Sequence, residues 1–200
     1  MSSSNSKEWY RKSEIDYFSA FLKLWLAFNA FYKRLYQVNR SLRNDRQFIE
    51  EIKNTNNPVR EKFQEYFVTS ESSEAVEFRF NLSCFVRKYS GTRSYNYSVK
   101  KNDSVGLKPQ MNGNVVEEID FSAFIHVRSH NLKNRTVKGH VKIENVYIKE
   151  DIDLIFLVFI EMLYMMRNSL VHGIMEPDED NHQTIKCCYI LLRLLIKDLV

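Results

Sequence analysis

One apolar run in the last third of the chain constrains the fold more than any other feature. Nearly every residue from Ile152 to Met166 is apolar, and the stretch from Leu154 onward carries a single charged side chain, Glu161. That stretch is shorter than the roughly 20 residues that a membrane span needs. A helix that is apolar on all sides is covered by the rest of the protein. The sequence therefore predicts a central buried helix and no membrane contact.

Apolar residues recurring at steps of three and four predict further helices around this one. They are expected over residues 11–40, 42–53, 58–67, 74–88 and 182–199. The chain holds only 5 Gly and 3 Pro, which argues against an all-β fold built on many tight turns. We expect a mainly all-α protein.

The middle of the chain breaks this pattern. From Ser90 to Asn114 the sequence is polar and rich in Gly and Pro, which is typical of a loop or insertion. Residues 115–127 fit a helix or a strand, 131–139 are turn-like, and 141–148 alternate as a strand would.

These segments together predict the domain organisation. Residues 1–10 are expected to be a disordered Ser-rich start, and 11–200 a single helical bundle. An irregular, partly β insertion at about 90–149 interrupts this domain.

The positive charge of the chain is concentrated in its middle third, over the insertion and the residues just before it. Residues 86–149 contain 12 Lys and Arg against 5 acidic residues, a net charge of +7, whereas the whole chain carries only +4. Such asymmetry favours a polyanionic partner, although a solvated basic loop would look the same. Tyrosines mixed with basic residues can hold single-stranded RNA, or can simply pack the insertion onto the bundle. The candidate RNA-binding residues are Arg87, Lys88, Arg93, Lys100 and Lys101.

Cysteine and histidine usage favours neither disulfides nor a metal site. Adjacent Cys187 and Cys188 point about 100° apart on a helix, which is poor geometry for a bridge. They are expected to be core residues of a cytoplasmic protein. His126, Arg128 and His130 alternate as they would on one face of a strand, where the two histidines could bind a metal or RNA. No cysteine or carboxylate cluster lies nearby to complete a metal site. No metal and no cofactor are expected.

The chemistry-bearing segment follows the apolar run, from Arg167 to Gly173. Asn168 and His172 lie four residues apart and so share a helix face, where the amide can hydrogen-bond the imidazole. Arg167 lies about 140° around the helix from His172, so its side chain must curl back. Gly173 is expected to end the helix in the left-handed conformation.

These residue types suit phosphodiester cleavage. His172 can take or give a proton near neutral pH, and the Arg167 guanidinium matches phosphate oxygens. Ser169 and the Asn168 amide are further candidates to position a phosphate. RNA supplies its own nucleophile, the 2′-hydroxyl, so this chemistry needs no metal.

A purely structural explanation of the motif stays open. Arg167 and His172 would also stabilise the last helical turn through the helix dipole. A second Arg, four residues, His pattern occurs at Arg135 and His140 in a turn-like region, where we interpret it as chance.

The segment Arg167-Asn168-Ser169-Leu170-Val171-His172-Gly173 resembles the signature of the HEPN superfamily (higher eukaryotes and prokaryotes nucleotide-binding). That signature is Arg, four to six residues, then His, commonly with Asn after the Arg. The segment from Leu24 to Tyr32 looks like the first helix of several HEPN branches. The resemblance covers roughly residues 11–88 and 150–199, and it leaves the insertion unexplained.

The resemblance implies a helical bundle that dimerises so that two motifs face one cleft. It further implies a metal-independent endoribonuclease of a toxin or antiviral defence system, with an antitoxin or defence partner protein. Arg167 would stabilise the phosphate, His172 would transfer protons and Asn168 would orient both. The products would be a 2′,3′-cyclic phosphate and a 5′-hydroxyl. Alternatively, the chain is an inert HEPN module that docks a protein or a nucleotide.

Overall fold

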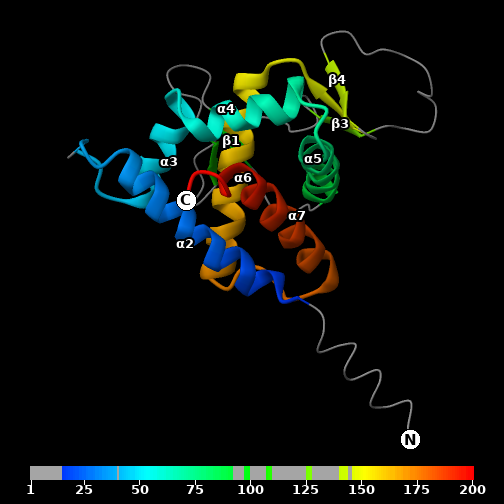
Figure 1. The fold of residues 1–200 in the computed structure, drawn as a ribbon. Coiled ribbons are helices and arrows are strands. Elements are labelled where there is room, and N and C mark those ends of the chain that lie inside the picture. Colours follow the sequence, from blue (N-terminus) through cyan, green and yellow to red (C-terminus); the bar gives the residue numbers. More distant parts are fainter. Residues whose placement is uncertain are drawn as a thin grey trace, which may run out of the picture.

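The computed structural model describes residues 15–39, 41–91 and 150–200, together with five short strands between residues 97 and 149. The predicted N-terminal segment 1–10 lies outside this part. The described protein is mainly α-helical (Figure 1), as expected from the sequence. Its helical elements are α2 (Tyr17–Leu35), α3 (Asp45–Asn54), α4 (Pro58–Gln64), the π-helix η1 (Glu65–Thr69), α5 (Ser73–Gly91), α6 (Ile152–Val171) and α7 (Glu179–Ile196).

Side-chain caps set where most of these helices begin. The Asp16 carboxylate accepts from the backbone N–H groups of residues 18 and 19, so α2 begins at residue 17 rather than within a longer helix over 11–40. Asn44 and Gln47 form a capping box at the start of α3. Asp151 and Asp178 cap α6 and α7.

Helix α6 lies in the middle of the bundle, with α2 and α3 on one side in Figure 1 and α5 on the other. It contacts α2, α3, α4 and α7. By length and mean hydropathy (1.7) it could cross a membrane, but 61% of its most apolar window is buried inside the protein. The apolar run is therefore the central core helix that the sequence predicts.

Apolar side chains from every helix fill the core around α6. Phe63 packs against Phe156 and Phe159 of α6, with ring centroids 5.4 and 5.2 Å apart. Cys187 and Cys188 are buried and all three cysteines are free thiols, as expected. Burial raises the pKa of the Cys188 thiol well above its usual value.

The insertion contributes five short strands. Strand β1 (Tyr97–Val99) pairs antiparallel with β2 (Leu107–Pro109). A second sheet has the order β3-β5-β4, formed by β3 (Ile125–Val127), β4 (His140–Ile143) and β5 (Val146–Lys149), and both pairings in it are antiparallel.

The single strand predicted over 141–148 is wrong, because β4 and β5 are two paired strands. Ile143 and Ile148 are both buried. Five positions apart in one continuous strand they would face opposite sides. Two antiparallel strands place both side chains in the core.

Candidate functional site

Helix α6 ends in a hydrogen-bonded motif that places His172 just beyond the helix. Gly173 has φ +65°, and its N–H donates to the Leu170 carbonyl over 3.1 Å. The N–H of Ile174 donates to the Ser169 carbonyl over 2.9 Å. These are the two bonds of a Schellman motif, which confirms the predicted stop at Gly173. His172 is the C-cap residue, the last position before the left-handed Gly173.

The Arg167 side chain is held in place by oxygens of two different helices. Its Nη1 donates to Asn168 Oδ1 over 2.9 Å, and its Nη2 lies 3.5 Å from Asp45 Oδ2, on the first residue of α3. The side chain is 22% exposed. The guanidinium is therefore oriented between α6 and α3 and remains within reach of solvent.

Asp45 also contacts two side chains of α2, one through a hydrogen bond and one through an ion pair. Asn29 Nδ2 donates to Asp45 Oδ1 over 2.9 Å, and Lys33 Nζ lies 3.4 Å from the same oxygen. The pKa of the nearby Tyr32 hydroxyl is raised by burial and, to a lesser extent, by the negative charge of Asp45. We name Asp45, Arg167, Asn168 and His172 the helix-end cluster.

His172 is exposed. Across residues 15–39, 41–91 and 150–200, its imidazole has no hydrogen bond, ion pair or ring contact. The predicted hydrogen bond between Asn168 and His172 is absent, because the Asn168 oxygen accepts from Arg167 instead. A charged donor makes the stronger bond. Asn168 therefore fixes Arg167, and the imidazole has no polar partner within the described part of the chain.

The remaining predicted RNA-binding residues receive little support. Ser169 is only 5% exposed, because its side chain faces the core, so it is not available to a phosphate. Arg87 is exposed on α5, where it contacts the Ser83 carbonyl and the Cys84 sulfur. It is not part of the helix-end cluster. The side chain of Lys88, and all of Arg93, Lys100 and Lys101, lie outside the described residues.

The sequence analysis missed a second polar group on α6. Glu161 and Lys53 are both fully buried, with Lys53 Nζ 2.8 Å from Glu161 Oε2. Arg46 pairs with the other Glu161 oxygen, and Glu50 contacts both cations. We name Arg46, Glu50, Lys53 and Glu161 the buried cluster. One acid inside an apolar run was the signal, since a buried carboxylate needs a cationic partner.

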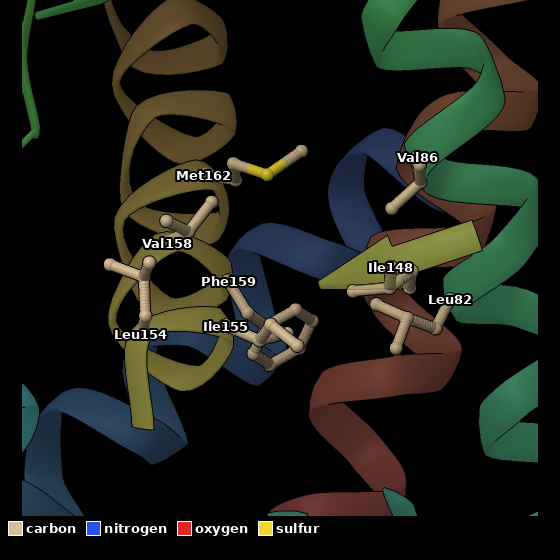
Figure 2. A pocket seen from close by; sticks show the side chains of 8 residues that line it. All are labelled: Leu82, Val86, Ile148, Leu154, Ile155, Val158, Phe159 and Met162. Atoms are coloured by element: carbon tan, nitrogen blue, oxygen red, sulfur yellow. The ribbon is translucent and has the colours of Figure 1, made fainter. Parts of the chain in front are cut away.

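The described part of the molecule also has an apolar cavity between α5, β5 and α6 (Figure 2). Its volume is about 20 Å³, enough for one water-sized sphere. It is lined by Leu82, Val86, Ile148, Leu154, Ile155, Val158, Phe159 and Met162. Since no lining side chain can ionise or donate a hydrogen bond, this cavity cannot carry acid–base chemistry.

The described residues contain no group of three or more His, Cys, Asp or Glu side chains placed to hold a metal ion. His126 belongs to β3, whereas Arg128, His130 and Arg135 lie outside the description. His140 begins β4, so the histidine of the second Arg–His pattern lies in a strand.

Comparison of the chain with family models, with curated proteins and with solved structures found no match. The chemistry of the site is therefore argued from its own residues. They are an oriented and partly exposed guanidinium, and an exposed imidazole five positions later at the same helix end.

Proposed function

We propose that the protein is a metal-independent endoribonuclease of HEPN type. The observation that carries the proposal is the helix-end cluster, where Arg167 is fixed by Asn168 and Asp45 while His172 is exposed and has no polar partner among the described residues. A fixed cation can stabilise charge that develops on a phosphate, and a free imidazole can move protons at neutral pH. Both stand on a rigid core helix, which favours precise placement.

The proposed reaction uses the 2′-hydroxyl of RNA as the nucleophile. That oxygen attacks the adjacent phosphorus, the bond from phosphorus to the 5′-oxygen breaks, and the products are a 2′,3′-cyclic phosphate and a 5′-hydroxyl. The 2′-hydroxyl proton passes to a base and the leaving oxygen receives a proton from an acid. Arg167 neutralises charge on the phosphate oxygens through its planar fork of donors.

A homodimer would supply both proton-transfer groups. One chain presents one His172 at this helix end, whereas the reaction needs a base and an acid on opposite sides of the phosphate. Two copies related by a twofold axis would place two Arg167 and two His172 around one cleft. The exposed apolar side chains of Val171 and Ile174 flank His172 and suit contact with a second copy.

The proposed biological setting follows from the resemblance to HEPN proteins. A cytoplasmic toxin or antiviral defence effector would cleave cellular or invading RNA and be restrained by an antitoxin or another defence protein. The surplus of basic residues at 86–149 supports an RNA substrate.

The proposal is tested by incubating the purified protein with RNA in EDTA and identifying the ends of the products. We expect cleavage, with 5′-hydroxyl ends that a polynucleotide kinase labels without prior phosphatase treatment. His172→Ala should abolish cleavage, while Arg193→Ala, which removes an exposed arginine of α7, should leave it unchanged. Intact RNA, or equal cleavage by His172→Ala, would remove the proposal.

One observation favours a second candidate, an inert module that docks a protein or a nucleotide. Arg167 already has an anionic partner, Asp45, within its own chain, and a phosphate would have to share the guanidinium. An inert module would bind its partner without cleaving RNA, and binding would persist in Arg167→Ala and His172→Ala.

A further inference from the structure

Arg167 needs to be held in one orientation for the proposed reaction, and its own helix supplies only part of that support. Asn168 contacts Nη1 from the adjacent position on α6. Asp45 contacts Nη2 from α3, a different helix. An arginine side chain is long and flexible, so a contact from across the helix pair fixes its direction in a way that a neighbour on α6 cannot.

Asp45 is itself fixed in place. The capping box of Asn44 and Gln47 orders the first turn of α3, where Asp45 stands. Asn29 of α2 donates to Asp45 Oδ1 over 2.9 Å, which leaves Oδ2 directed at Arg167. The carboxylate is therefore anchored before it contacts the guanidinium.

The buried cluster locks α3 against α6. Arg46 and Lys53 of α3 both pair with Glu161, which lies less than two helical turns before Arg167. Because Arg46 and Lys53 of α3 both pair with the one buried carboxylate of Glu161 on α6, a shift of either helix along the other would break an ion pair. The register that brings Asp45 to Arg167 is thus set inside the core.

We propose that Asp45 is a positioning residue that acts through Arg167, an inference that rests on the proposed ribonuclease function. Asp45 itself is negatively charged and is repelled by a phosphate. It holds Nη2 while the remaining N–H donors of the guanidinium stay available to phosphate oxygens. The opposite role, in which Asp45 inhibits by competing with the phosphate for Arg167, predicts the opposite sign in the test.

The kinetic test compares Asp45→Asn with a matched control at the other end of α6. Asp153 pairs with Arg60 over 2.7 Å, also between α6 and a neighbouring helix, so Asp153→Asn removes a similar charge without touching the site. We expect Asp45→Asn to lower kcat about tenfold with little change in KM, because a misplaced group slows the chemical step. Asp45→Glu should restore part of the rate, and Asp153→Asn should match the parent.

The decisive kinetic comparison uses the Arg167→Ala background. If Asp45 acts through Arg167, adding Asp45→Asn to Arg167→Ala should not lower kcat any further. An equal tenfold loss in both backgrounds, or a higher rate for Asp45→Asn in the parent, overturns the proposal.

A second measurement separates this inference from the proposed function. The NMR order parameter of the Arg167 Nε–H group, assigned by its loss in Arg167→Ala, reports how firmly the guanidinium is held. It should fall in Asp45→Asn and stay unchanged in Asp153→Asn. If the protein cleaves no RNA but the order parameter falls, the ribonuclease function is wrong and the positioning contact stands. An unchanged order parameter removes the positioning contact whatever the activity.

Discussion

The two polar clusters of α6 join the same pair of helices in different ways. The buried cluster and the helix-end cluster both tie α3 to α6, and Glu161 and Arg167 lie close together on one helix. Lys53 and Glu161 are fully buried, whereas Arg167 is partly exposed and His172 is exposed. The Lys53–Glu161 pair therefore faces only protein, although Arg46 and Glu50 beside it are 29% and 32% exposed, whereas the helix-end cluster presents Arg167 and His172 to solvent.

Two polar clusters between the same pair of helices can thus have different roles, one in stability and the other in the reaction. In the buried cluster, Lys53 and Glu161 pair with each other out of contact with solvent, and Arg46 and Glu50 pair with them from its partly exposed edge. In the helix-end cluster, Arg167 keeps donors in reach of solvent, and the His172 side chain makes no hydrogen bond, ion pair or ring contact within the described residues. We expect changes in the first cluster to act on folding, and changes in the second to act on the reaction.

The largest expected effect is on stability, from Glu161→Gln. Removing this charge leaves Lys53 buried beside a neutral amide, and losing one partner of a buried pair costs about 3–5 kcal/mol. Urea unfolding followed by circular dichroism measures the loss. Glu50→Gln, which changes a partly exposed acid of the same cluster, should cost less than about 1 kcal/mol. Equal losses for the two variants would contradict the distinction between them.

The next largest effect is expected for Arg167→Ala, and it should appear in the cleavage rate rather than in stability. Loss of a group that stabilises the transition state typically costs about 10²–10³ in kcat, roughly 2.7–4 kcal/mol. The ion pair with Asp45 is partly exposed, so the free energy of unfolding should change by less than about 1 kcal/mol. Arg167→Lys keeps the charge but loses the planar fork, and should fall between the parent and Arg167→Ala. If Arg167→Ala lowered the free energy of unfolding but kept the parental cleavage rate, Arg167 would be a structural residue rather than a catalytic one.

Gly173→Ala tests the backbone that ends α6. No atom lies within 4 Å of the position that a Cβ would take, so the cost comes from the positive φ alone. That cost is about 1–2 kcal/mol in unfolding free energy. Gly173→Asn should cost less, since asparagine tolerates this conformation better. Identical stabilities for the parent and Gly173→Ala would mean that the helix end does not need the left-handed residue.

The smallest effect is expected for Asp153→Asn at the opposite end of α6. Its carboxylate pairs with Arg60, but the Asp153 side chain is 70% exposed and the pair is screened by solvent. Unfolding free energy should fall by less than about 1 kcal/mol, and the cleavage rate should be unchanged. A loss of unfolding free energy as large as that of Glu161→Gln would show that solvent exposure does not determine how much an ion pair of this helix contributes to stability.

Local signals explain which features the sequence could predict. The apolar run predicts α6 as the core helix, and Gly173 after the last apolar turn predicts where that helix ends. Both depend on residues close together in the chain, which is why the structure bears them out.

Contacts between distant segments explain what the sequence could not predict. Nothing near Arg167 indicates that Asp45 would contact it, because that contact depends on how α3 packs on α6. The predicted bond from Asn168 to His172 respected helix spacing but ignored the neighbouring Arg167, which competes for the same oxygen. Burial of Ser169 likewise follows from packing that a motif alone does not contain.

The most direct test of the division between the two clusters is a single-turnover RNA cleavage assay in EDTA with His172→Ala, at matched concentrations of folded protein. The account predicts a rate at least about 100-fold below that of the parent, with unchanged unfolding free energy, because His172 is exposed and moves protons. Asp153→Asn, which leaves both clusters intact, should cleave at the parental rate. Cleavage by His172→Ala at the parental rate would contradict the account.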